Sequence, residues 1–320
     1  MLEFLQRRWF LLALAVTLLL GAWFYRPLTP MVERLPRNWL VASVLLAMGL
    51  TLRTDAIRAV LSRPLPTLLG VGVNLVILPL LAWAMSPLLS GQLRSGFLVA
   101  AAVPCTIASA AVWTRRAGGN DAIALSVTLI TNLSCFLATP AWLRWTAGHS
   151  TQMAGGFGPM ATKLALLVVL PILLAQSLRT IGFVGSWSAR HKQELGVYCQ
   201  LGILAMVLIG AVYSGATIAH LADGWNLLAG EGALMLVLVA LLHLVAWLLA
   251  DWLAGKLGLS SAEGLAVAFS GSQKTLMVGL AVALDFGGLA VLPLIAYHAI
   301  QLLVDTVLAD RYRIGDAASE

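Results

Sequence analysis

Long apolar segments are the feature that most constrains this chain. A helix that crosses a bilayer needs about 20 mostly apolar residues, and the sequence offers ten such candidates. They lie at residues 9–25, 38–52, 66–86, 93–113, 121–143, 160–178, 195–213, 232–250, 263–284 and 287–308. We therefore predict an all-α integral membrane protein with ten transmembrane helices.

The composition supports this class and excludes others. Hydrophobic residues make up 60% of the 320 residues and charged residues only 11%, whereas a soluble domain carries about 25% charged residues. The 20 Lys and Arg exceed the 14 Asp and Glu, but they are scattered between the apolar runs, so we expect no nucleic-acid partner. The three Cys show no metal-ligand spacing, and we expect no disulfide framework and no bound metal.

The basic residues predict the orientation. Thirteen Lys and Arg lie in gaps on the same side as the N-terminus and six in gaps on the other side. The positive-inside rule then places both termini in the cytoplasm of a multi-pass protein of the cell (inner) membrane. Arg7 and Arg8 precede the first apolar run, but no cleavage motif follows it, so we expect a membrane helix there rather than an export signal.

Two spans contain residues that interrupt a helix. The fourth carries Pro104 within residues 103–109 and the ninth carries Gly271 within residues 269–275. A separation of five helices fits two inverted five-helix repeats, and interrupted helices at matching positions point to the central site of a transporter. An ordinary proline kink and a packing glycine are the alternative. We predict a single transporter unit over 1–320, with repeats at 1–147 and 159–312 joined by the Gly-rich stretch 144–159.

Lys274 is the most informative single residue, because an ammonium inside a span is costly and rarely present without a function. The alternative is that its side chain reaches the membrane interface. No Asp or Glu falls near the middle of a predicted span, so we expect neither a carboxylate cation site nor a carboxylate proton relay. For His243 and His298 we favour neutral hydrogen bonding between helices over proton carriage. Asn74 and Asn132 serve either as contacts between helices or as ligands in a cavity.

Enzyme motifs are absent: the sequence contains no HExxH, GxSxG, P-loop or GxGxxG pattern. We therefore expect no catalytic residues and no cofactor, apart from coupling to Na⁺ or H⁺. Ser272 beside Lys274 keeps an intramembrane hydrolase as a less favoured alternative.

The sequence resembles the bile acid:sodium symporter superfamily, in particular its divergent branch typified by solute carrier family 10 member 7 and bacterial relatives. The resemblance covers roughly residues 5–312 and is most specific at 104–109, 119–127 and 271–276. It implies two inverted five-helix repeats, a panel and a core domain, and broken helices four and nine that cross at their centres. It also implies alternating access for organic anions, with sodium coupling in the best-known members.

The sodium ligands of that family are largely replaced here. The resemblance aligns the sodium-binding Glu of helix nine with Phe269 and the following Asn with Lys274, while the Gln between them is kept as Gln273. The Asn after the helix-four Ser is lost, because Ser109 is followed by Ala110. The matching positions that remain are Ser126 in helix five, with Ile130 in place of a Thr and Thr131 beside it, and Asn74 in place of a Gln in helix three.

Two hypotheses about the ion follow from the resemblance. In the first, Lys274 replaces the sodium ion, and transport is sodium-independent or proton-linked. In the second, sodium occupies a new site built from Ser109, Ser126, Thr128, Thr131 and Gln273.

The predicted function is secondary transport of a small organic anion. We expect the substrate to be bound by Thr106, Ser109, Gln273, Lys274 and Thr275. The alternative function is a non-transporting membrane regulator of ion or lipid handling. The expected partners are the substrate and membrane lipid, with no obligate protein partner evident.

Overall fold

The computed structural model describes residues 2–52, 64–107, 109–147, 156–221 and 228–317, and these residues form helices joined by short connections. Within these ranges, seven helices are long and apolar enough to cross a membrane, or eight if one bent pair counts as a span. The seven are Pro64–Leu88, Asp121–Thr146, Phe157–Arg179, Lys192–His220, Ala229–Lys256, Ser261–Phe286 and Gly288–Tyr312. They coincide with seven of the predicted segments, so the chain is a multi-pass α-helical membrane protein.

The other three predicted spans are not among these seven helices. The first, in α1 (Leu2–Trp23), bends by 107° into α2 (Tyr25–Arg34). The second, α3 (Arg37–Thr51), has 15 residues, fewer than the roughly 20 that a span needs. The fourth is divided into α7 (Gly91–Ala102) and α8 (Ser109–Arg116). Residues 53–63, with three of the basic residues used for orientation, and residues 148–155 of the predicted join at 144–159 lie outside the described residues.

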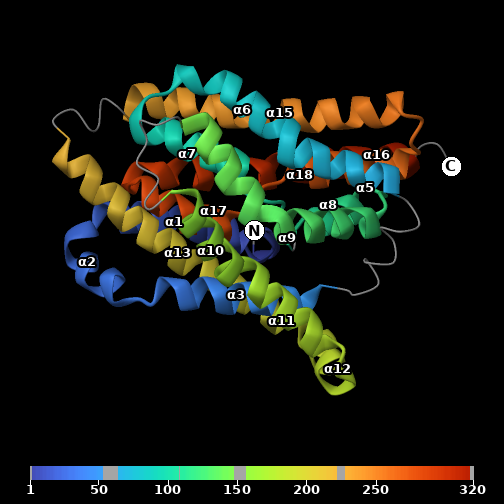
Figure 1. The fold of residues 1–320 in the computed structure, drawn as a ribbon, viewed down its shortest axis with the longest axis horizontal. Helices are drawn as coiled ribbons and strands as arrows, with labels where there is room; N and C mark the ends of the chain where they lie inside the picture. The colour runs from blue at the N-terminus through green and yellow to red at the C-terminus, as the bar shows by residue number, and fades with distance from the viewer. Residues whose placement is uncertain (1, 53–63, 108, 148–155, 222–227, 318–320) are drawn as a thin grey trace.

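The helices pack in two groups (Figure 1). In the first, α13 (Lys192–His220) packs against α1, α2 and α3, and α3 packs against α11 (Leu170–Arg179). In the second, α16 (Ser261–Ser272) packs against α5 (Pro64–Gly72), α8, α9 (Asp121–Ala147) and α15 (Ala233–Lys256). Helix α18 (Leu292–Ala317) joins the second group through α7, α8 and α15. Helix α12 (Gly182–Arg190) extends away from both groups at the lower right of Figure 1.

A proline shapes the third predicted span. Between α5 and α6 (Leu78–Met85), residues Val73–Ile77 form a π-helical turn in which the Leu78 N–H bonds to the Val73 carbonyl. Pro79 has no N–H to offer the next carbonyl, that of Asn74, so this carbonyl is left to accept from outside the helix. The Leu75 carbonyl accepts from Trp142 Nε1 at 2.6 Å. A second π-helical turn, Ala165–Val169, lies between α10 (Phe157–Leu164) and α11, again just before a proline.

The segment Ser261–Phe286 lies in the centre of the protein. Its most apolar stretch is 100% buried, compared with 28% for Phe157–Arg179. Helix α16 begins with a capping box, in which Ser260 and Glu263 bond to each other's backbone N–H groups. After Ser272 the backbone becomes extended, and a helix resumes as α17 (Leu276–Ala283). Short helical turns at Leu284–Phe286 and Gly288–Val291 then lead into α18.

Candidate substrate and ion site

Two buried non-helical segments meet in the second group of helices. Residues 103–107 separate α7 from α8, and residues 273–275 separate α16 from α17. The Thr275 N–H donates to the Pro104 carbonyl at 2.9 Å, so the two segments are joined by a backbone hydrogen bond. Pro104 lies in the first of these segments, whereas Gly271 lies in the last turn of α16, just before the second. Their relation by an inverted repeat stays a prediction.

Lys274 is 3% exposed, and its ammonium lies among oxygen atoms of two other elements. Nζ donates to the Asn74 carbonyl at 2.7 Å, the Val103 carbonyl at 2.8 Å and the Asn74 side-chain oxygen at 3.2 Å. An ammonium has three N–H donors, and this arrangement provides one acceptor for each. The positive charge therefore ties the 103–107 segment to the π-helical turn that carries Asn74.

The carbonyl groups at the end of α16 accept hydrogen bonds from side chains of two other elements, the π-helical turn that carries Asn74 and α18. The amide nitrogen of Asn74 donates to the carbonyls of Ser270, Gly271 and Gln273 at 2.9–3.2 Å. Tyr297 Oη donates to the Ser272 carbonyl at 2.7 Å. Gln301 pairs with the backbone of Lys274, accepting from its N–H at 2.9 Å and donating to its carbonyl at 3.1 Å. A helix end leaves carbonyls without partners, and here buried side chains supply the donors.

Side chains of helix α9 likewise form hydrogen bonds with backbone groups of the 103–107 segment. Asn132 Nδ2 donates to the Cys105 carbonyl at 2.9 Å, and Thr128 Oγ1 donates to the Thr106 carbonyl at 3.2 Å. The Cys105 N–H donates to Thr131 Oγ1 at 3.3 Å, and Thr139 Oγ1 donates to the Ala102 carbonyl at 2.8 Å. Thr128, Thr131 and Asn132 therefore support the extended backbone of this segment.

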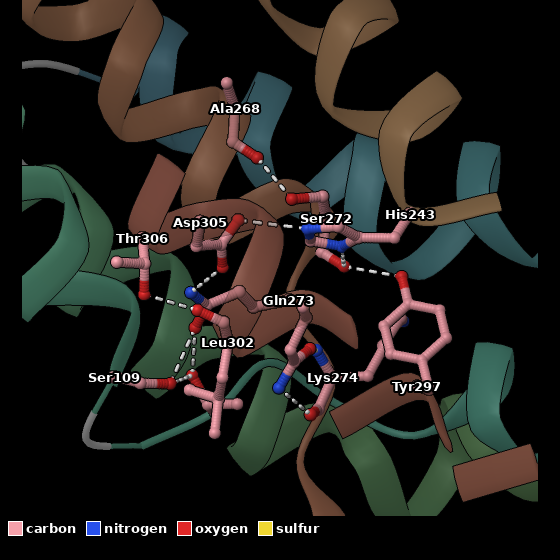
Figure 2. A network of polar contacts seen from close by, with 12 residues as sticks. Ser109, His243, Ala268, Ser272, Gln273, Lys274, Tyr297, Leu302, Asp305 and Thr306 are labelled. Atoms are coloured by element: carbon pink, nitrogen blue, oxygen red, sulfur yellow. Dashed lines mark hydrogen bonds and ion pairs between the residues drawn. The ribbon is translucent and has the colours of Figure 1, made fainter. Parts of the chain in front are cut away.

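Gln273 connects the crossing to a buried pair of polar side chains, Asp305 and His243. Its Oε1 accepts from Thr106 Oγ1 at 2.6 Å and from Ser109 Oγ at 2.8 Å. Its Nε2 donates to Asp305 Oδ2, and Asp305 Oδ1 lies 2.9 Å from His243 Nε2 (Figure 2). The side chains of His243 and Asp305 are both 0% exposed.

The position of Asp305 corrects the sequence analysis. We expected no carboxylate near the middle of a span, and with the last predicted span ending at residue 308, Asp305 fell close to its end. Helix α18 instead continues to Ala317, which places Asp305 inside the helix, and the packing buries it completely. Tyr297, Gln301 and Asp305 recur at intervals of four residues, so they share one helix face. This polar stripe was the sequence signal that could have identified them.

A cavity of about 210 Å³ adjoins the crossing. Thr106, Ser109 and Thr275 supply hydroxyl groups to its wall, and His298 and Leu302 line it from α18. On the opposite side it is lined by residues of α1, α3 and α13, among them Phe10, Met48, Thr51, Cys199 and Ile203. The cavity thus lies between the two groups of helices and is mainly apolar, with a few polar groups at the crossing.

Some predicted site residues lie apart from this cavity. Lys274 does not line it and instead borders a small space of about 10 Å³. Ser126 donates to the carbonyl of Ala122 in its own helix. Phe269, at the aligned Glu position, is fully buried and meets Trp247 edge to face.

The contacts of Ser272 and Lys274 do not form a catalytic pair. Ser272 Oγ donates to the Ala268 carbonyl at 2.8 Å, within its own helix (Figure 2). The Lys274 ammonium instead bonds to Asn74 and Val103. A serine nucleophile needs a base within hydrogen-bonding reach, so this geometry gives no support to the hydrolase alternative.

Comparison with known proteins agrees with a transporter. A sequence model of the SBF-like CPA transporter family matches residues 8–314. An uncharacterized protein of Pseudomonas aeruginosa is 31% identical over 265 residues, which cover 79% of this chain and 77% of that protein. The sodium/bile acid cotransporter 7 of Rattus norvegicus is 24% identical over 329 residues, which cover 96% of this chain and 93% of that protein.

Proposed function

The chain belongs to the SBF-like CPA transporter family, and on this basis we propose that it is a secondary transporter of a small organic anion in which the Lys274 ammonium takes the place of a coupling sodium ion. The observation that carries this proposal is the set of oxygen atoms around Nζ. Two backbone carbonyls and one amide oxygen lie at 2.7–3.2 Å from it. Such carbonyls at an interrupted helix are the groups that coordinate sodium in transporters with broken helices.

The replacement of residues beside this position supports the same proposal. Phe269, where the resemblance expects a Glu ligand, is buried against Trp247 and brings no negative charge. Both exchanges change the charge in the same direction. A sodium site that holds Na⁺ and a Glu carboxylate sums to zero charge, whereas Lys274 and Phe269 leave one positive charge that is present without a bound ion. The competing sodium site of Ser109, Ser126, Thr128, Thr131 and Gln273 remains the alternative within this function.

The cavity supports an organic substrate. It is mainly apolar, which suits the carbon skeleton of such a molecule. The Thr275 hydroxyl can donate a hydrogen bond to an anionic group, and so can one of the Thr106 and Ser109 hydroxyls while the other donates to Gln273. The relative from Rattus norvegicus is named as a sodium/bile acid cotransporter, and a bile acid is an organic anion. Lys274 does not line the cavity, so it acts on the substrate only through the electric field of its positive charge. This charge lies in the segment that also carries Gln273 and Thr275.

We place this site in ten helices arranged as two inverted repeats, 1–147 and 159–312. The order of elements supports this architecture: a long helix, an interrupted helix and another long helix occur at 64–147 and again at 229–317. In each copy the final helix, α9 or α18, donates side-chain hydrogen bonds to the interrupted segment. With the basic residues inside, both termini lie in the cytoplasm and the protein resides in the inner membrane.

The test is the thermal stability of the purified protein in sodium or potassium salts. The variants are Lys274→Asn, the double variant with Phe269→Glu added, and Lys256→Asn as a matched control at an exposed lysine. A ligand that binds only the folded protein stabilises it by about 2.7 kcal/mol at a hundredfold excess over its Kd. We expect sodium to stabilise the Lys274 variants and leave wild type and Lys256→Asn unchanged. Stabilisation of wild type by sodium would instead show that a sodium site persists beside Lys274.

A further inference from the structure

His243 and Asp305 form a buried hydrogen-bonded pair to which the proposed replacement of sodium by Lys274 gives no role. The two side chains come from α15 and α18, and both are completely buried. His243 Nε2 lies 2.9 Å from Asp305 Oδ1, and Nδ1 lies 3.4 Å from the Ser272 carbonyl. Both ring nitrogens therefore face oxygen acceptors. A neutral imidazole has one N–H and an imidazolium has two, so the charged form can donate to both oxygens.

The charge of this pair sets the net charge of the crossing. Lys274 contributes one positive charge and Asp305 one negative charge when both are ionised. His298 Nδ1 accepts from Gln301 Nε2 at 2.9 Å, so that nitrogen carries no proton and His298 is neutral. With neutral His243 the sum is zero, and with charged His243 it is plus one. A single proton thus decides whether the buried site carries an excess positive charge.

Gln273 connects this charge to the cavity. Its Nε2 donates to Asp305, and its Oε1 accepts from Thr106 and Ser109, which line the cavity. One side chain therefore separates the His243–Asp305 pair from the cavity wall (Figure 2). Charges interact more strongly in a buried environment than in water, so an excess positive charge here favours an anion in the cavity.

We propose that His243 and Asp305 form a proton-binding site, and that uptake of one proton by this pair favours binding of one anion in the adjacent cavity. The inference rests on the proposed transport function and adds the proton as its coupling ion. Proton and anion then enter the site together with no change in its net charge. Loss of the proton returns the crossing to neutrality and releases the anion.

The surroundings of the pair contain few other charges. Helices α5 and α6 and the turn between them, which pack against α15, carry no titratable side chain. The Tyr297 ring meets His243 at right angles, with centroids 5.7 Å apart. The charged or titratable groups on α7, α8, α13, α16 and the turn Leu228–Gly232, which pack against α15 or α18, are Arg94, Arg115, Arg116, Lys192, Glu194, Tyr198, Cys199, Tyr213, His220, Glu231 and Glu263. Among the side chains that the structure describes, α15 and α18 themselves also carry Asp251, Lys256, Tyr297, His298, Asp310, Arg311 and Tyr312. Glu263 bonds to Ser260, and Asp310 pairs with Arg116, so these two are engaged elsewhere.

The test observes the imidazole directly. Protein labelled with ¹⁵N in its histidine rings is reconstituted in lipid bilayers in potassium buffers, and NMR spectra are recorded between about pH 5 and 8, where histidine changes charge. We expect one signal, absent from His243→Gln, to convert from imidazole to imidazolium as the pH falls. In Asp305→Asn this signal stays neutral, because the counter-charge is gone. His220→Gln, at an exposed helix end, serves as the control and leaves the conversion unchanged.

The coupling is tested in the same samples with potassium acetate, butyrate and benzoate, three monoanions of increasing apolar size. We expect at least one of them to increase the imidazolium fraction of His243 at fixed pH in wild type, and none to do so in Asp305→Asn. A His243 signal that never becomes charged, or that becomes charged equally in Asp305→Asn, overturns the proton site. A conversion that no anion alters overturns the coupling. The sodium test involves neither group, so its failure is recognised separately.

Discussion

The Lys274 ammonium donates to Asn74, 200 positions away in the sequence, and the Asn74 amide donates to backbone carbonyls of the segment just before Lys274. The Lys274 ammonium donates to the backbone and side-chain oxygens of Asn74. The Asn74 amide donates to the carbonyl of Gln273, next to Lys274, and to two carbonyls at the end of α16. Each residue therefore satisfies groups that the other element leaves without a partner. This relationship holds the interrupted helix against the π-helical turn of the third predicted span.

Replacement of Asn74 tests that relationship. Asn74→Leu has a similar size but removes one acceptor of Lys274 and the shared donor of three buried carbonyls. An unsatisfied buried polar group costs about 1–3 kcal/mol, and we expect the free energy of unfolding in mixed micelles to fall by that amount. Asn38→Leu, at an exposed position in α3, is the control and should change little. Equal stability of the two variants would contradict the structural role of Asn74.

Lys274 can also be replaced by a soluble cation. Lys274→Ala keeps the oxygens of Asn74 and Val103 but leaves space where the side chain was, and a small ammonium can donate to the same oxygens. We expect ethylammonium chloride to raise the melting temperature of this variant and not that of wild type. Tetramethylammonium chloride, which has no N–H group, controls for salt. If both salts act alike on Lys274→Ala, the oxygens around Nζ do not form a cation site.

The sequence predicted the parts of this site that depend on local pattern. Lys274 was conspicuous because a charge stands inside an apolar run, and Pro104 and Gly271 marked the extended segments because these residues weaken helices. Seven predicted spans coincide with long helices because hydropathy alone defines them. The bend between α1 and α2 was not predicted.

The sequence could not show which polar residues meet. Asp305 was assigned near a helix end because the apolar run stops at residue 308, whereas the helix continues beyond it. Its partners His243 and Gln273 lie 62 and 32 positions away. Such pairings depend on the packing of α15, α16 and α18. For the same reason, Asn74 and Asn132 could not be resolved as ligands or as contacts between helices.

The two hydroxyl groups that donate to Gln273 predict that removing both has a non-additive effect on stability. Thr106 and Ser109 both donate to the same buried oxygen, so either one alone keeps it satisfied. We expect Thr106→Val and Ser109→Ala to lower the free energy of unfolding slightly, and the double variant to lower it by more than the sum, by about 1–3 kcal/mol in total.

The control for this cycle is Thr217→Val, because the Thr217 hydroxyl bonds to the carbonyl of Tyr213 in its own helix. Combined with either single variant it should give additive changes. Additive effects of Thr106→Val and Ser109→Ala would instead show that each hydroxyl stabilises the site independently of Gln273.

Two glycines predict opposite effects of the same substitution. A Cβ at Gly96 in α7 would collide with the backbone oxygen of Ala290, in the turn before α18, and a backbone cannot move aside as a side chain can. Overpacking of this kind costs about 1–3 kcal/mol, so we expect Gly96→Ala to lower the melting temperature.

Gly255 lies exposed near the end of α15 with no heavy atom within 4 Å of a new Cβ. Alanine is favoured over glycine in helices by up to about 1 kcal/mol, so Gly255→Ala should maintain or raise the melting temperature. A melting temperature of Gly96→Ala equal to that of Gly255→Ala would show that α7 and this turn do not pack as closely as the structure places them.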